Sequence, residues 1–125
     1  MVKATKLALN ADTVAQLCVE YWKLIAATEK SLKLISGSGG KRLEGQLKFS
    51  KRQLDVLAQE LGLRLVDYTG EQFHPGLAVS IENPGDHGDD ENLTVGKTLE
   101  PTVMSDMTVV RLGRVILEPF KQKEE

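Results

Sequence analysis

The chain has 125 residues and a mass of 13.8 kDa, a length that suits one domain or at most two small modules. Hydrophobic residues make up 41% and charged residues 27%, which is ordinary for a folded protein and argues against global disorder. The net charge of −2 creates no field that would gather nucleic acid or an anionic membrane, so we expect neither as a partner. A protein surface is the more natural target.

The first predicted element is a helix from Asp12 to about Ile35. Its apolar residues recur at alternating steps of four and three, with Thr28 filling the one gap, which is the spacing of a heptad stripe. Asp12 or Asn10 can cap the start of the helix, and the run from Ser36 to Gly40 ends it with residues that favour turns. The stripe consists of Val14, Cys18, Tyr21, Ile25, Leu32 and Ile35.

The second predicted helix runs from about Lys41 to Leu61 and repeats the heptad spacing. Gly62 follows it and is placed to form a left-handed C-cap. Because the linker between the two helices is short, we expect them to fold back as an antiparallel hairpin. The stripe of the second helix consists of Leu43, Leu47, Leu54, Leu57 and Leu61.

Three further apolar residues, Leu17, Trp22 and Leu24, lie outside the first stripe. A lone two-helix hairpin would leave this second apolar face in water, and a second copy of the chain is the simplest cover for it. We therefore predict a homodimer that forms a four-helix bundle. Its interface would consist of the two stripes together with Leu17 and Leu24.

After Gly62 the pattern changes to short alternating or β-branched runs, which predict strands. Turn-forming residues separate the runs at His74-Pro75-Gly76, Asn83-Pro84-Gly85 and Ser105-Asp106, and Gly113 inside the last run predicts a bulge or a bend. The predicted strands are residues 63–68, 77–82, 93–99, 102–104 and 107–117. The expected fold is therefore α+β, with a helical hairpin in residues 1–62, a small antiparallel β domain in residues 63–120 and a polar tail in residues 121–125.

Catalytic, metal and cofactor sites have no recognisable residue set in this sequence. His74 could act as a general base, but neither a nucleophile nor an orienting partner can be identified for it. The acidic run Asp86–Glu91 could hold a metal ion, although its spacing fails the EF-hand loop and a solvated loop is the simpler interpretation. We expect no enzyme activity and no required cofactor or metal.

The compartment is predicted from the single cysteine and the N-terminus. Cys18 cannot form an intrachain disulfide and fits a reducing environment, where we expect it to pack as a small hydrophobic residue. Residues 1–10 lack an apolar region of signal length, and no apolar run is long enough to span a membrane. We predict a cytoplasmic protein. The basic residues of the second helix are interpreted as its solvated face: Lys41, Arg42, Lys48, Lys51 and Arg52.

Three segments of the chain, residues 43–63, 73–75 and 95–111, resemble parts of the GrpE family of chaperone nucleotide-exchange factors. The stretch from Leu43 to Leu63 resembles the family's second bundle helix and its exit into the first strand. Phe73-His74-Pro75 is similar to the family's Phe-Asp-Pro turn, and Val95–Arg111 is similar to its closing hairpin, which leads into a final strand like Arg114–Leu117. The chain resembles a short form without the family's long N-terminal coiled coil, because only about ten residues precede the first predicted helix.

The resemblance implies a mechanical function rather than a chemical one. The β domain would wedge against the nucleotide-binding domain of a DnaK-type chaperone and favour an open cleft that holds ADP poorly. Thr108 stands where the family has an exposed arginine, whereas Arg111 is retained. The alternative is a dimeric protein-interaction adaptor with the same fold and no exchange activity. The implied contact residues are Pro75, Gly76, Met104, Ser105, Asp106, Met107, Thr108 and Arg111.

Overall fold

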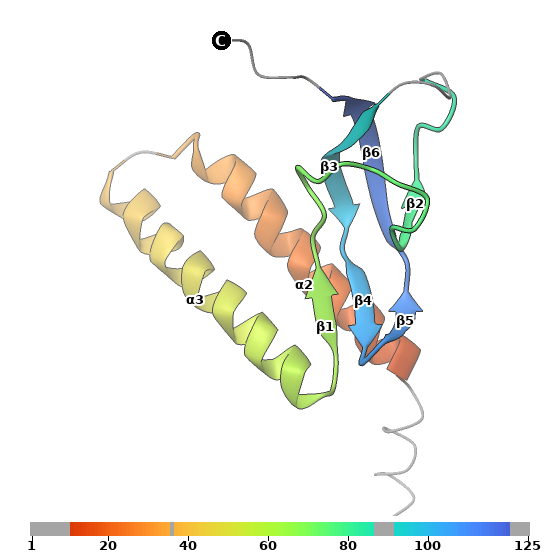
Figure 1. The fold of residues 1–125 in the computed structure, drawn as a ribbon. Helices are drawn as coiled ribbons and strands as arrows, with labels where there is room; N and C mark the ends of the chain where they lie inside the picture. Colours follow the sequence, from red (N-terminus) through yellow and green to blue (C-terminus); the bar gives the residue numbers. More distant parts are fainter. Residues whose placement is uncertain (1–10, 36, 87–91, 121–125) are drawn as a thin grey trace, which may run out of the picture.

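The computed structural model describes residues 11–35, 37–86 and 92–120. Two helices form a hairpin that lies along one side of the strands (Figure 1), so the predicted α+β class with a helical hairpin is confirmed. The helices are α2 (Ala11–Leu32) and α3 (Ser38–Glu60). The strands are β1 (Arg64–Val66), β2 (Val79–Ile81), β3 (Leu93–Glu100), β4 (Thr102–Ser105), β5 (Thr108–Arg111) and β6 (Gly113–Pro119).

The end of α3 turns the chain from the hairpin into the β region. Gly62 has a φ of 78°, which is the left-handed conformation expected of a C-cap glycine. The Leu63 N–H donates to the carbonyl of Ala58 at 2.8 Å, and the Gly62 N–H donates to the carbonyl of Gln59 at 2.9 Å. These two bonds are those of a Schellman motif, so the predicted cap is confirmed.

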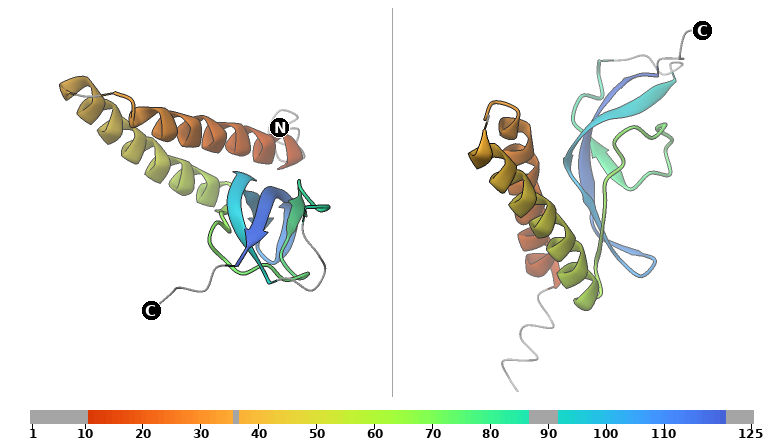
Figure 2. Two further views of the ribbon diagram at one scale, coloured as in Figure 1. Left: turned by 90° about the horizontal axis from the view of Figure 1, so that it is seen from above. Right: turned by 90° about the vertical axis from the view of Figure 1, so that its left-hand side faces the viewer.

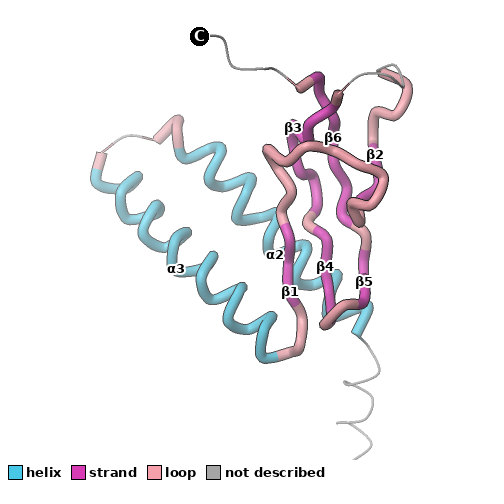
Figure 3. Tube along the Cα trace, viewed as in Figure 1, coloured by secondary structure: helices cyan, strands magenta, loops and turns pink. Residues whose placement is uncertain are grey.

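One long, bent β hairpin forms the middle of the β region. Its two arms are β3 continuing into β4, and β5 continuing into β6, and both ladders between the arms are antiparallel. The arms bend beside Pro101, so that β4 and β5 join β1 in the sheet β1-β4-β5, while β3 and β6 join β2 in the sheet β2-β6-β3 (Figure 3). A single pair of chain segments therefore supplies strands to both sheets.

Two details of the predicted β domain differ from the structure. The segment 107–117 forms two strands, β5 and β6, because the chain bends immediately before Gly113 to change sheets. The pairing is antiparallel throughout except that β2 pairs parallel with β6, with Val79 opposite Gly113, so the second sheet is mixed. After β1 the chain crosses to the other sheet, where β2 runs in the same direction as β6.

The core consists of two clusters of buried side chains. The larger cluster joins the hairpin to the first sheet, with Ala15 and Val19 of α2 and Val103 of β4 all 0% exposed. The smaller cluster surrounds Val95 and Val115 in the second sheet. The larger cluster contains residues from both sides of residue 62. At the predicted boundary the chain therefore changes from helix to strand, between elements that pack together.

The junction between the two sheets is closed by Thr102, which is fully buried. Its Oγ1 donates to the carbonyl of Ala78 at 2.6 Å and accepts from the Gly113 N–H at 3.1 Å. A Cβ on Gly113 would lie 2.7 Å from the carbonyl oxygen of Glu100 and 2.8 Å from the nitrogen of Thr102. Gly113 is therefore required by close backbone approach.

Gly113→Ala is expected to lower the free energy of unfolding by about 1–3 kcal/mol, because backbone atoms of β3 and β4 must move to admit the methyl group. Denaturant unfolding measures the change. Gly45→Ala is the matched control: Gly45 lies inside α3 with no atom within 4 Å of an added Cβ, so this substitution should stabilise by about 0.5–1 kcal/mol. Equal effects of the two substitutions would contradict the close approach at Gly113.

Candidate protein-interaction surfaces

The helical hairpin has an apolar face that no described element covers. Leu17 and Leu24 of α2 are 69% and 68% exposed, and they share a helix face with Tyr21 because the three are four and three residues apart. The start of α2 lies beside the end of α3 in an antiparallel hairpin, where Leu57 and Leu61 are also exposed. We call these five residues the outer helix face.

The outer helix face points away from the sheets. On α2, the opposite side carries Lys23, whose Nζ reaches Glu100 at the end of β3. On α3, Asp55 lies close to Leu63 and Leu65 at β1. The buried Leu54 separates Asp55 from Leu57 around the helix, so Leu57 lies on the side away from β1. Figure 2 shows the two helices lying on one side of the strands.

The predicted dimer-interface residues fall into three groups. Part of the heptad stripe is buried inside the single chain and is already covered without a partner. Another part is half-buried against the same core. The rest is exposed and could be covered by a second copy. The buried group is Cys18, Ile25, Leu47 and Leu54; the half-buried group is Val14, Leu32 and Leu43; the exposed group is Leu17, Tyr21, Leu24, Ile35, Leu57 and Leu61.

The turn between β4 and β5, which we call the β4–β5 tip, carries most of the implied chaperone contact. Asp106 has a φ of 56°, which closes the turn tightly, and Met107 beside it is 93% exposed. Thr108 is exposed as well, whereas Met104 and Ser105 are half-buried. The tip therefore presents a single long apolar side chain on a short paired hairpin.

Two exposed apolar residues next to the tip were not predicted as contact residues. Val109 is 39% exposed and Leu112 is 52% exposed, so apolar surface continues from Met107 along β5 to the bend. In the sequence both residues belong to a β-branched run that predicts a strand, and such a run does not reveal which side faces water. Pro75 and Gly76 are exposed in the loop before β2, in the other sheet, where the Gly76 N–H donates to Nδ1 of His74 at 3.1 Å.

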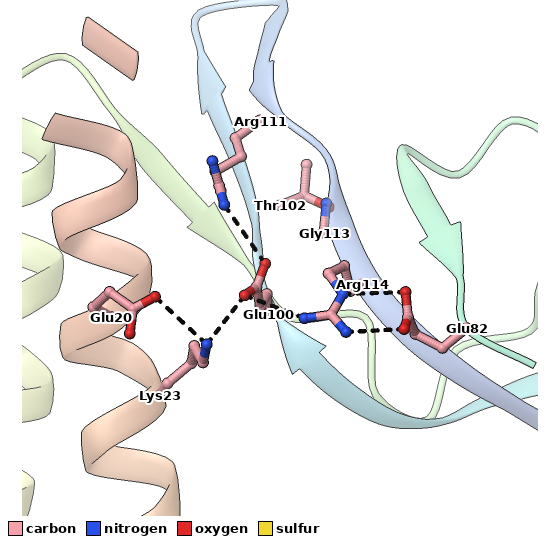
Figure 4. Close-up of polar contacts among 8 residues, drawn as sticks. All are labelled: Glu20, Lys23, Glu82, Glu100, Thr102, Arg111, Gly113 and Arg114. Atoms are coloured by element: carbon pink, nitrogen blue, oxygen red, sulfur yellow. Dashed lines mark hydrogen bonds and ion pairs between the residues drawn. The ribbon is translucent and has the colours of Figure 1, made fainter. Parts of the chain in front are cut away.

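Arg111 is placed differently from the tip. Its guanidinium turns toward Glu100, with Nη2 3.9 Å from Oε1 (Figure 4), and the side chain is only 29% exposed. Glu100 is 8% exposed and also contacts Lys23 at 3.2 Å and Arg114 at 3.4 Å. Three cations from α2, β5 and β6 thus surround one buried carboxylate. Because Lys23 belongs to α2 and the other residues of the cluster belong to β3, β5 and β6, these contacts link the helical hairpin to the strands.

The pKa shifts follow these contacts. The hydrogen bond to Glu100 raises the pKa of Lys23, although burial acts in the opposite direction. Arg114 makes two hydrogen bonds to Glu82, of 2.9 and 3.1 Å, which lower the pKa of the Glu82 carboxyl and raise the pKa of Arg114. The bidentate pair joins β6 to the end of β2, next to the only parallel ladder among the described strands.

Glu82→Gln is expected to lower the free energy of unfolding at pH 7 but not in acid. The folded-state pKa of Glu82 is depressed, so its contribution to stability is present above the ordinary glutamate pKa of about 4.3 and is lost as the pH falls through the lower folded value. Urea unfolding of both proteins from pH 7 downward should show curves that converge. Glu71→Gln removes an exposed carboxylate with no ion pair among the described residues, and it should leave stability at pH 7 unchanged. A constant offset for Glu82→Gln at every pH would contradict the role of the charge.

Other candidate sites can be placed as follows. Cys18 is buried in the larger core, and burial raises the pKa of its thiol, which suits a packing residue. Among the described residues no group of three or more histidine, cysteine or acidic side chains is arranged to hold a metal ion. Most of the predicted acidic run, residues 87–91, lies outside the described residues. Neither described helix combines the length and apolar character needed to cross a membrane.

No protein-family model matches the chain, and no curated protein or solved structure matches it either.

Proposed function

We propose that this chain is a nucleotide-exchange factor of the GrpE type, which promotes ADP release from a DnaK-type chaperone in the cytoplasm. The observation that carries the proposal is the β4–β5 tip, where Met107 projects with 93% of its surface exposed. The tip belongs to a hairpin whose arms are paired into both sheets, and the Glu100 cluster ties those arms to α2. An apolar side chain held in this way suits insertion into the surface of another protein.

The proposed mechanism requires only differential binding of two states. If the tip fits the open form of the chaperone's nucleotide-binding domain better than the closed form, it shifts the population toward the open form. Reciprocity then requires ADP to weaken binding of the tip by the same factor by which the tip weakens binding of ADP. A coupling of ~1–3 kcal/mol corresponds to roughly a 5–150-fold change in affinity. No catalytic residue or cofactor takes part.

The outer helix face supports the second half of the proposal, that the protein acts as a homodimer. Leu17, Leu24 and Leu57 expose from 49% to 69% of their surfaces on one side of the hairpin. A twofold pair of hairpins would cover the same patch on both chains, since a twofold interface is self-complementary. Two β4–β5 tips would then be carried by one helical bundle.

The test is ADP release from a DnaK-type chaperone of the same cell. The chaperone is loaded with fluorescent ADP and chased with unlabelled nucleotide, with and without the wild-type protein at matched salt. We expect acceleration that saturates as the protein is added. An unchanged release rate at saturating concentration would refute exchange activity.

A dimeric adaptor without exchange activity is the second candidate, and the position of Arg111 favours it. Because Arg111 faces the buried Glu100, the tip presents no arginine to a partner, and Thr108 occupies the place of the family's exposed one. An adaptor would bind through the outer helix face or the tip but leave ADP release unchanged. The release experiment separates the two functions directly.

A further inference from the structure

The end of the helical hairpin at which α2 connects to α3, which we call the far end, is strongly basic. Residues 30–52 contain seven lysines and arginines and one acidic residue, Glu44, which gives this stretch a net charge of +6 in a chain of net charge −2. The rest of the chain therefore carries −8. The stretch comprises the end of α2, the connection and more than half of α3, and Figures 1 and 2 show that this end extends beyond the strands. Charge is separated along the molecule.

A groove of about 500 Å³ opens between the two helices at this end. Its lining includes the apolar residues Leu32, Ile35 and Leu47, which we call the floor; Leu47 is buried, whereas Ile35 is 46% exposed. Lys33 and Lys41 stand on its rim, and neither has an acidic partner within 4.0 Å among the described residues. The groove thus combines an apolar floor, of which Ile35 is the exposed part, with two lysines that have no acidic partner among the described residues.

The charges next to the groove are only partly balanced. Glu44 lies 3.9 Å from Lys48, and Glu29 lies 3.2 Å from Lys51, so the two carboxylates on the rim already have cationic neighbours. Lys33 and Lys41 are left to attract an anion. We propose that this basic groove binds an acidic amphipathic segment of another protein, with an apolar side chain on the floor and carboxylates against Lys33 and Lys41.

The lining favours a protein segment over a nucleic acid. Single strands are held by aromatic side chains that stack on bases, and none of the residues that line the groove is aromatic. Glu29 and Glu44 would stand beside any phosphate bound there, whereas a peptide can keep its carboxylates on the lysine side. The apolar floor would stay uncovered beneath a phosphate backbone but is filled by a leucine or isoleucine of an amphipathic helix. This surface is separate from the β4–β5 tip and the outer helix face.

The first test uses a synthetic peptide as the probe. A fluorescein-labelled helical peptide with leucines four and three residues apart and glutamates elsewhere is titrated with the full-length protein, and fluorescence anisotropy reports binding. We expect binding that weakens as salt is raised, since the contact is partly between exposed charges. A second peptide with the same charge and serine in place of leucine should bind at least about tenfold more weakly if the floor is used.

Substitutions in the protein then locate the contact. Lys33→Glu combined with Lys41→Glu should weaken binding of the leucine peptide by about tenfold or more. The matched control, Arg64→Glu with Lys97→Glu, changes net charge equally at exposed positions of the strands and should leave binding within about twofold. Ile35→Ser tests the floor separately. Circular dichroism verifies that each variant retains its helices.

Four outcomes would overturn the proposal. They are the absence of peptide binding at millimolar protein, equal binding of the leucine and serine peptides, equal loss in the control pair, and tighter binding of a thymidine oligonucleotide or of phosphatidylserine vesicles through Lys33 and Lys41. The last outcome would assign the basic end to a nucleic acid or to a membrane surface. Release of ADP from the chaperone is measured independently, so failure of the exchange function leaves this test intact.

Discussion

Met107→Glu is expected to abolish stimulated ADP release while leaving the protein folded and its oligomeric state unchanged. Met107 is 93% exposed, so a carboxylate at this position is fully hydrated in the free protein and does not disturb the core. In the proposed complex the same carboxylate would be pressed into an apolar contact and lose its water without gaining a partner. The acceleration of ADP release expected of an exchange factor should therefore be lost, and the release rate should fall to the unstimulated value.

Leu34→Glu is the matched control for this experiment. Leu34 is 88% exposed at the far end of the hairpin, so the substitution makes the same chemical change at a distance from the tip. It should leave ADP release unaffected. Equal acceleration by wild type and by Met107→Glu would show that the contact surface has been wrongly placed, and helical content and native mass serve as controls for both variants.

Aspartate substitutions in the helices are expected to have two distinct outcomes. Leu54 is 4% exposed and packs in the larger core, so Leu54→Asp buries an unpaired carboxylate and should unfold the chain, because the cost is comparable to the 5–15 kcal/mol that stabilises a typical domain. Leu24 is 68% exposed, so Leu24→Asp should leave the hairpin folded but separate the proposed dimer.

Circular dichroism and analytical ultracentrifugation distinguish these outcomes. The expected pattern is loss of helix for Leu54→Asp, and retained helix with halved mass for Leu24→Asp. A wild-type protein that is monomeric at micromolar concentration would remove the dimer from the proposal. Unfolding by Leu24→Asp would instead place this side chain in the core of the single chain, in conflict with its exposure.

The helices could be predicted from the sequence because their signals are local. Heptad spacing and the Gly62 cap depend on neighbours within a few turns, and both the hairpin and the cap are confirmed. The same spacing did not reveal what covers each apolar residue. Ala15 and Val19 of α2 are fully buried and lie on a second apolar stripe, which faces the strands. A helix that packs against both a second helix and a sheet needs a wider apolar face than one heptad stripe provides.

The remaining features depend on contacts between distant residues. The parallel pairing of β2 with β6 has no local signature, because the same short β-branched run can pair in either direction. The orientation of Arg111 could not be predicted from the sequence either. Its ion-pair partner Glu100 becomes buried only when the two sheets and α2 pack together. Gly113 was the exception: glycine inside a strand marked the bend correctly.

The bent hairpin also bears on the order in which the chain folds. Its arms are close in sequence and can zip from the turn at Asp106, whereas β1 and β2 must return from farther along the chain. We expect the β hairpin to form early in folding. Destabilising substitutions near its turn should then slow folding, whereas those in β2 should mainly speed unfolding. Side chains at the β4–β5 tip would then have two roles. They would have to stay exposed for binding a partner, and they would have to form the turn from which folding starts.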